Sequence, residues 1–197
     1  RPAGASNFAI QPYPTELIET WTWQDQAVLL RPIRPEDEAQ HRAFLEKLDP
    51  EDIRLRVFYS RRTIEHSELA RLTQIDYARE MAFIATRSLD AGGEETLGTV
   101  RAAVDPDNHT AEFGVIVRSD LKGSGLGFRL MSKMIEYLRA RGTRRLVGTV
   151  LGVNHAMLEL ARSLGFQASD NPGDPGDREL RFVSLDLQTP QTLPPQP

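Results

Sequence analysis

Hydrophobic and polar positions change their spacing several times along this chain. Residues 28–34, which begin with three aliphatic residues, predict a strand, and Pro35 with the acids after it is typical of a helix start. Within that helix, one face at i, i+3, i+4 and i+7 is apolar and expected to be buried, made of His41, Phe44, Leu45 and Leu48. Asp49-Pro50 ends the helix. Residues 51–74 continue as a second, less regular helical region rich in arginine.

The middle of the chain favours strands. Residues 81–88 and 95–104 predict a hairpin around the turn Asp90–Gly93, and residues 110–117 predict a third strand. An amphipathic helix follows at about 125–141, with an apolar face made of Gly127, Met131, Met134, Ile135 and Leu138. A strand at 146–151, a helix at 154–164 and a strand at 178–187 complete the pattern. This alternation predicts an α/β or α+β domain built on a sheet.

The two ends of the chain differ from this domain in composition. Residues 1–14 contain three prolines and one glycine and are expected to be a linker, and the chain starts with Arg1 instead of methionine. We therefore expect a piece cut from a longer protein. Residues 188–197, with four prolines, predict a disordered proline-rich tail. The folded domain is expected at 15–187.

Composition narrows the possible functions. The formal net charge of −4 lacks the basic excess of nucleic-acid binders. The chain has no cysteine, which removes a cysteine nucleophile and is compatible with a reducing, cytoplasmic location. No two of the four histidines have the spacing of a zinc or di-iron site, so no metal is expected. No apolar run is long enough for a membrane span.

The candidate chemistry concentrates in a glycine-rich loop between a strand and a helix. Its residues are Lys122, Gly123, Ser124, Gly125, Leu126 and Gly127. The glycines allow unusual backbone conformations and close approach of a ligand, and the following helix N-terminus favours a phosphate or pyrophosphate. The loop lacks the Walker lysine spacing and the dinucleotide fingerprint. A turn without any ligand remains the alternative from the loop alone.

The strand before the loop supplies a candidate base. Its alternation puts Phe113, Val115 and Val117 on one face, and Glu112 with Gly114 on the other. An amine such as lysine, with a pKa of about 10.4, must lose a proton before it attacks a thioester. Glu112 could accept that proton as a general base. A solvated acid on an exposed strand face is the alternative.

These segments together resemble the Gcn5-related N-acetyltransferases (GNAT). The resemblance rests on the strand, the 122–127 loop, the helix and strand after it, Asn154 and Leu164-Gly165-Phe166, and it covers about residues 28–187. It implies the GNAT fold, a central mixed and mostly antiparallel sheet flanked by helices, with strands splayed at the acetyl-CoA cleft.

Three segments are similar to a narrower group, the bacterial Pat-type protein lysine acetyltransferases. They are Tyr13-Pro14, residues 30–37 and residues 73–82. This resemblance implies acetylation of a lysine in a protein such as AMP-forming acetyl-CoA synthetase, which switches the target off. It also implies fusion to an NDP-forming acyl-CoA-synthetase-like region in the full-length protein.

The resemblance also implies roles for individual residues. Glu112 would be the general base, and the backbone of the 122–127 loop would hold the CoA pyrophosphate. Val115, Ile116 and Val117 would follow the pantetheine arm, with main-chain bonds from Val115 and Val117. Asn154 would lie beside the same arm, although it could simply cap its helix.

Three positions depart from the family pattern. Lys122 replaces the usual glutamine or arginine and loses the planar fork of arginine. Ala161 occupies the position of a tyrosine that serves many relatives as general acid, so water or another group must protonate the thiolate. Asp25-Gln26-Ala27 stands where relatives usually have a tight Asp-Gly-Thr turn. We expect this difference to affect the local structure and not the chemistry.

Several hypotheses remain open at this stage. A protein lysine acetyltransferase working by direct transfer in a ternary complex is favoured, because no cysteine can carry the acetyl group. A small-amine acetyltransferase and a non-catalytic acetyl-CoA sensor are the alternatives. His155 and Ser124 are not expected to be catalytic. A solvated helix surface is favoured over a docking surface for four arginines: Arg54, Arg56, Arg61 and Arg62. A structural network is favoured over catalysis for four polar residues: Asp76, Tyr77, Arg79 and Glu80.

Overall fold

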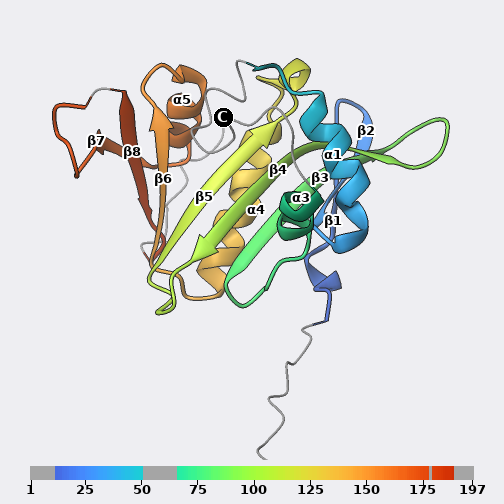
Figure 1. Ribbon diagram of the computed structural model, residues 1–197, viewed down its shortest axis with the longest axis horizontal. Helices are drawn as coiled ribbons and strands as arrows, with labels where there is room; N and C mark the ends of the chain where they lie inside the picture. Colours follow the sequence, from blue (N-terminus) through green and yellow to red (C-terminus); the bar gives the residue numbers. More distant parts are fainter. Residues whose placement is uncertain (1–11, 51–65, 178, 189–197) are drawn as a thin grey trace, which may run out of the picture.

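The computed structural model describes residues 12–50, 66–177 and 179–188. These residues form one eight-stranded sheet with flanking helices (Figure 1). In spatial order its strands are β1 (Glu19–Trp23), β2 (Gln26–Pro32), β3 (Glu80–Ser88), β4 (Glu94–Val104), β5 (Thr110–Val117), β6 (Arg145–Leu151), β8 (Leu180–Asp186) and β7 (Gln167–Asp170). The helices are α1 (Glu38–Glu46), α3 (His66–Thr73), α4 (Leu126–Ala140) and α5 (His155–Ser163), with short 3₁₀ turns η1 (Thr15–Leu17), η2 (Pro35–Asp37) and η3 (Ser119–Leu121).

The sheet is mixed and mostly antiparallel, as expected. Neighbouring strands run antiparallel except for β5 and β6, which are parallel. The β5–β6 pairing covers only residues 110–112 against residues 145–147, whereas β5 continues to Val117 and β6 to Leu151. The two strands therefore separate after Glu112, and the expected splayed strands are confirmed (Figure 1).

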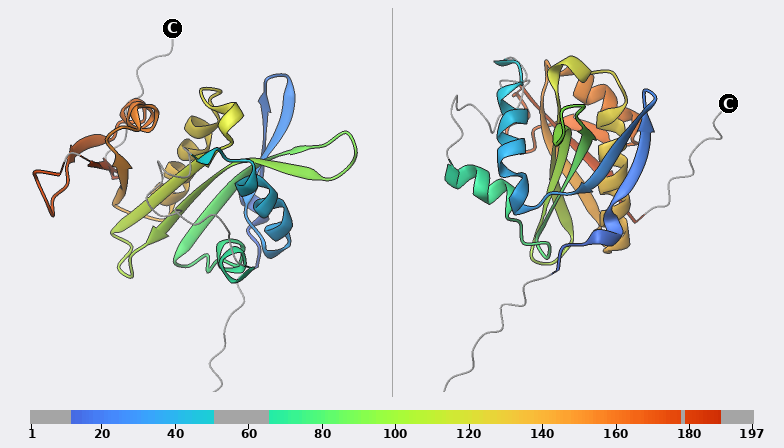
Figure 2. Two further views of the ribbon diagram at one scale, coloured as in Figure 1. Left: turned by 45° about the horizontal axis from the view of Figure 1, so that its top comes forward. Right: turned by 90° about the vertical axis from the view of Figure 1, so that its right-hand side faces the viewer.

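The helices cover both faces of the sheet. Figure 2 shows α1 and α3 on one face and α4 on the other. The main core lies between the sheet and α4, where the inward face of the helix is buried and consists of Leu126, Leu130, Met131, Met134, Ile135 and Leu138. A smaller cluster joins α1 and α3 to β5 through Phe44, Leu45, Leu48, Leu69, Leu72 and Ile116. The apolar faces predicted for both amphipathic helices are therefore buried, apart from Gly127, which is partly exposed.

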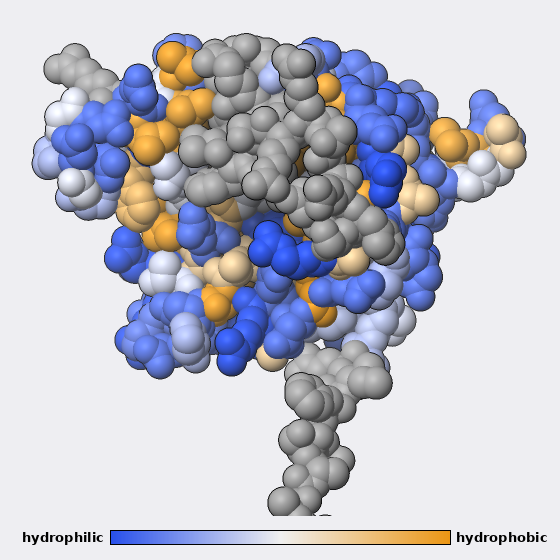
Figure 3. Space-filling model, in the orientation of Figure 1, coloured by the Kyte–Doolittle hydropathy of each residue, from blue (hydrophilic) through white to orange (hydrophobic). Residues whose placement is uncertain are grey.

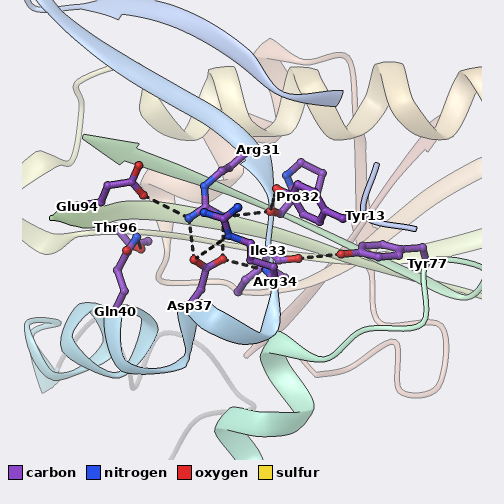
Figure 4. Close-up of polar contacts among 10 residues, drawn as sticks. All are labelled: Tyr13, Arg31, Pro32, Ile33, Arg34, Asp37, Gln40, Tyr77, Glu94 and Thr96. Carbon is purple, nitrogen blue, oxygen red and sulfur yellow. Dashed lines mark hydrogen bonds and ion pairs between the residues drawn. The ribbon is translucent and has the colours of Figure 1, made fainter. Parts of the chain in front are cut away.

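A buried ion pair anchors the start of α1. Arg31 donates two hydrogen bonds to the carboxylate of Asp37, at 2.8 and 2.7 Å, and each side chain is only 4% exposed (Figure 4). The same carboxylate accepts from the backbone N–H of Arg34 at 2.9 Å, which closes the η2 turn ahead of the helix. Asp37 thereby connects strand β2 to the first turn of α1.

The three segments that resemble Pat-type enzymes meet around this ion pair. The Tyr13 hydroxyl donates to the Pro32 carbonyl at 2.6 Å, and the Tyr77 hydroxyl donates to the Ile33 carbonyl at 3.0 Å (Figure 4). Glu80, also from the third segment, pairs with Arg101 on β4. The structural role expected for the polar residues at 76–80 is therefore confirmed for Tyr77 and Glu80.

Two strands were not predicted from the sequence. β1 alternates Glu19, Trp21 and Trp23 toward α4 with exposed threonines, and its first inward residue is a charged side chain. β7 consists of Gln-Ala-Ser-Asp and is exposed throughout, so it carries no apolar signal. The β1–β2 turn is closed by Gln24 and Asp25, which have φ values of 48° and 60°. Other element boundaries agree with the prediction to within about two residues, apart from the helical region at 51–74, of which residues 66–73 are described.

Of the expected flanking segments, only the inner ends are described. Within 1–14, Tyr13 contacts the domain through Pro32, and within 188–197 only Gln188 belongs to the described residues. No helix in the described part of the chain is both long and apolar enough to cross a membrane.

Candidate functional site

A cavity of about 450 Å³ opens between the glycine loop, the free end of β5 and helix α5. All ten residues expected to bind the cofactor line it: Val115, Ile116, Val117, Lys122, Gly123, Ser124, Gly125, Leu126, Gly127 and Asn154. The cavity lies where β5 and β6 no longer pair, and residues of α5 form its opposite wall.

The glycines of the loop serve two different purposes. Gly123 and Gly125 have φ values of 73° and 88°, a region that other residues rarely adopt, and a Cβ on either would meet nothing within 4 Å. Gly127 is instead a packing position, since its Cβ would lie 3.2 Å from Leu160 Cδ2 on α5. The first two glycines shape an open loop, and the third lets α4 and α5 approach closely.

The N-terminus of α4 presents unpaired backbone donors to this cavity. Gly125 is the N-cap, and the first bond of the helix runs from the Arg129 N–H to the Gly125 carbonyl at 3.0 Å. The N–H groups of Leu126, Gly127 and Phe128 therefore lie outside the intrahelical ladder. Together with the helix dipole they form an arrangement that suits a phosphate or pyrophosphate.

The residues at the end of β5 differ in how they face the cavity. Val115 and Val117 belong to the core on the α4 side, whereas Ile116 packs with α1 and α3 on the opposite face. Ile116 nevertheless lines the cavity, which fits an approach to its main chain. Main-chain groups beyond Gly114 have no β6 partner, so they can hydrogen-bond to an extended ligand arm.

Asn154 caps helix α5 and also lies in the wall of the cavity. Its side-chain oxygen accepts a hydrogen bond from the Met157 N–H at 3.2 Å and caps α5. The residue also lines the cavity. Capping fixes the side chain at the mouth of the site without removing it from reach of a ligand.

Glu112 lies outside the cavity lining, at the apex of the strand separation. It pairs with Val147 of β6 and with Ala103 of β4, and its side chain is exposed. It shares its sheet face with Gly114, where a Cβ would meet nothing within 4 Å. The carboxylate thus stands beside open space three residues before Val115, the first β5 residue of the cavity.

Three other candidate positions do not present a reactive side chain to the cavity. The Ser124 hydroxyl donates to the Leu121 carbonyl, which fits a structural role better than a nucleophile. Ala161 is buried in the core at 1% exposure, and His155 is exposed on α5. The arginines at 54, 56, 61 and 62 lie outside the described residues.

Several residues of the cavity were not foreseen from the sequence. They are Leu121, Phe128, Ala156, Met157, Glu159, Leu160 and Ser163. Most come from α5, which the sequence predicts as a helix with Asn154 as its one candidate site residue. Phe128 carries a recognisable signal, because an aromatic side chain follows the glycine loop directly and remains 46% exposed.

The surface around the site is locally apolar. Figure 3 shows hydrophobic side chains gathered over α5 and the adjoining end of β6, where Val153 is 63% exposed. Within the described residues, no group of three or more histidine, aspartate or glutamate side chains is arranged to hold a metal ion. The site therefore offers backbone donors, apolar walls and a nearby carboxylate.

The sheet opens between two parallel strands beside a glycine loop, an arrangement that suits a phosphate-bearing coenzyme. The sequence pattern of the acetyltransferase (GNAT) family matches residues 34–166. The chain belongs to this family. Its members use acetyl-CoA, and the chain is an acetyl-CoA-dependent N-acetyltransferase.

Individual relatives agree with this assignment. An acetyltransferase of Pseudomonas aeruginosa is 32% identical over 147 residues, which cover 75% of this chain and 78% of the relative. An L-methionine sulfoximine/L-methionine sulfone acetyltransferase of the same species is 31% identical over 62% of this chain and 81% of its own length. The crystal structure of the GNAT domain of S. lividans PAT has the same fold, with a TM-score of 0.76 and 21% identity over 89% of this chain and 99% of that domain.

Proposed function

We propose that this domain transfers the acetyl group of acetyl-CoA directly to the side-chain amine of a lysine in a protein substrate, with Glu112 as general base. The observation that carries the proposal is the position of Glu112 on the last β5–β6 pair, next to the opening that leads to the glycine-loop cavity. An acceptor amine on the exposed face can reach Glu112 while the donor occupies the cavity.

The donor would bind through main-chain groups. Free N–H groups at the start of α4 would hold the pyrophosphate, and Lys122, which lines the cavity, would add a positive charge. The pantetheine arm would follow the unpaired edge of β5 from Val117 toward Val115. This direction brings the thioester to the apex of the strand separation.

The acceptor must arrive as a neutral amine. At neutral pH a lysine amine, with a pKa of about 10.4, is almost entirely protonated. Glu112 would accept the proton, directly or through one water, as the nitrogen attacks the thioester carbonyl carbon. The new N–C bond forms, the C–S bond breaks, and CoA leaves as a thiolate. Because Ala161 offers no hydroxyl, we propose that solvent protonates that thiolate.

Two observations favour a protein lysine over a free amino acid. The face beside Glu112 is open at Gly114, which leaves room for an acceptor carried on a large surface. Arg101, the cross-strand partner of Gly114, already bonds Glu80 and the Leu72 carbonyl. Because these bonds occupy its guanidinium, Arg101 is not available to bind the α-carboxylate of a free amino acid. The Pat-type segments at 13–14, 30–37 and 73–82 support the same choice.

A small-amine acetyltransferase is the second candidate. The relative named for L-methionine sulfoximine and L-methionine sulfone is 31% identical to this chain and supports it. A non-catalytic sensor of acetyl-CoA is the third, and it predicts binding without turnover. Acyl-CoA synthetases as targets, fusion to a synthetase-like region and a cytoplasmic location stay predictions.

Acetyl transfer from radiolabelled acetyl-CoA separates these candidates. The acceptors are intact AMP-forming acetyl-CoA synthetase, the same protein with its acetylated lysine replaced by arginine, and L-methionine sulfone. Label on the first acceptor alone supports the proposal. Label on the free amine and never on protein would exclude it in favour of the second candidate, and tight binding without any transfer would favour the sensor.

A further inference from the structure

The glycine loop receives a hydrogen bond from β1, the strand at one edge of the sheet. The indole N–H of Trp23, the last residue of β1, donates to the Ser124 carbonyl at 2.9 Å. Trp23 is 4% exposed and lies in the main core, 101 residues away from Ser124 in sequence. A buried donor that ends on a loop carbonyl contributes more than packing, because it also fixes the direction of that carbonyl.

The orientation of this carbonyl determines the orientation of the next donor. In a trans peptide the C=O and the following N–H point in opposite directions within one plane. The Ser124 carbonyl points to Trp23, so the Gly125 N–H points away from the core. Gly125 is exposed, lines the cavity and has a φ of 88°, and a glycine at this position could otherwise flip its peptide easily.

A second contact from the same strand holds the helix behind the loop. Glu19 bonds Arg129 on α4, and its other carboxylate oxygen lies 3.1 Å from Lys133 Nζ. Because Glu19, Trp21 and Trp23 alternate along β1, all three face α4. β1 therefore bonds α4 through Glu19 and the glycine loop through Trp23. These contacts attach both the loop and the helix to the same strand of the sheet.

We propose that Trp23 is a positioning residue that holds the Ser124–Gly125 peptide in the orientation that binds the pyrophosphate of acetyl-CoA. This inference rests on the proposed function, which assigns the pyrophosphate to the glycine loop. Trp23 does not touch the reacting atoms and acts only through the direction of the Gly125 N–H.

The test compares two donors in two matched variants. Trp23→Phe keeps an aromatic ring in the core and removes the indole N–H that bonds the loop. Trp21→Phe makes the same change on the same face of β1 and leaves the bond from Trp23 to Ser124 in place. S-acetylpantetheine has the thioester and arm of acetyl-CoA but no pyrophosphate. We expect Trp23→Phe to raise the KM for acetyl-CoA roughly three- to tenfold, the range for one neutral hydrogen bond. The kcat with either donor and the kcat/KM for S-acetylpantetheine should stay within about twofold.

Each other outcome has a defined meaning. An equal loss with both donors, or the same loss in Trp21→Phe, would overturn the inference, because packing alone would then account for it. If Gly125→Ala weakens acetyl-CoA binding but Trp23→Phe does not, only the inference fails. If the wild-type enzyme does not prefer acetyl-CoA over S-acetylpantetheine and Gly125→Ala has no effect, the proposed pyrophosphate site fails.

A measurement on the unaltered residue covers the case in which Trp23→Phe does not fold. In the Trp21→Phe protein, Trp23 supplies the remaining indole N–H resonance, since the chain has two tryptophans. We expect this resonance to shift on addition of CoA and not on addition of pantetheine. An indole resonance that is unchanged at saturating CoA would contradict the coupling.

Discussion

Glu112 of β5 and Val147 of β6 form the last parallel pair before the two strands separate. Residues 110–112 of β5 pair with β6, so the sheet is continuous there. From residue 113 to Val117 the edge of β5 that faces β6 has no strand partner. In the proposed mechanism, an amine from one face and a thioester from the opening meet beside this carboxylate. This relationship connects a sheet irregularity to the proposed chemistry.

The first prediction concerns the base. Glu112→Gln keeps the size of the side chain and removes its ability to accept a proton. We expect kcat to fall by about 10²- to 10⁴-fold, with the dissociation constant of acetyl-CoA unchanged. Kinetics from pH 6 to 10 and calorimetric titration with acetyl-CoA measure both quantities. Glu136→Gln, an exposed position on α4, is the control. Unchanged turnover across the pH range would remove Glu112 from the mechanism.

The second prediction uses two glycines with matched backbones. Gly125 and Gly142 have φ values of 88° and 80°, and a Cβ on either would meet nothing within 4 Å. Alanine at either position should cost about 1–2 kcal/mol of stability, because both adopt the left-handed region. Only Gly125→Ala should raise the KM for acetyl-CoA, since Gly142 ends α4 far from the loop. Equal KM values in the two variants would contradict the loop assignment.

The third prediction concerns the buried ion pair of Figure 4. Asp37→Asn removes the buried counter-charge of the Arg31 guanidinium, which is 4% exposed, and leaves only the longer contact to Glu94 at 3.4 Å. Urea unfolding should show a loss of about 3–5 kcal/mol. Asp120→Asn removes a partner of Arg118 whose carboxylate is 60% exposed, and should cost less than about 1 kcal/mol. Similar losses in both variants would mean that burial does not set the strength of the first pair.

The fourth prediction is a pH dependence of stability. Burial, together with the positive charge of Arg101, lowers the pKa of His41 to about 4. The unfolded chain, with a histidine pKa of about 6.5, binds this proton first, so the free energy of unfolding falls as the pH drops from 6.5 toward 4. His41→Phe should flatten this part of the profile, measured as urea midpoints between pH 7 and 4.5. A variant profile that parallels the wild type would contradict it.

Much of the fold could be predicted because its signals are local. The stripe of Phe44 and Leu45 on α1 and the alternation around Val115 follow directly from the period of each element. β1 was not predicted because its inward face includes the charged Glu19, whose partners Arg129 and Lys133 are more than a hundred residues away in sequence. A single sequence contains no local trace of such a pairing.

The candidate site divides in the same way. The glycine loop and Asn154 could be predicted, because turn and cap chemistry is local, and all of them line one cavity. Trp23 and the α5 residues Met157, Leu160 and Ser163 could not. Trp23 reaches the loop from strand β1, 101 residues away in sequence, and the α5 residues line the cavity where β5 and β6 no longer pair. Neither could the distance of Glu112 from the cavity lining be read from its spacing in β5.

The most direct test of the central claim is a time course of acetyl transfer to protein. Intact AMP-forming acetyl-CoA synthetase is incubated with acetyl-CoA and either wild-type enzyme or Glu112→Gln, and the acetylated residues are mapped by mass spectrometry. We predict that wild-type enzyme acetylates a defined lysine and inactivates the target, and that Glu112→Gln slows this reaction at least a hundredfold without weaker acetyl-CoA binding. Acetylation at equal rates by both enzymes, or transfer to free amines with no protein lysine modified, would contradict the account.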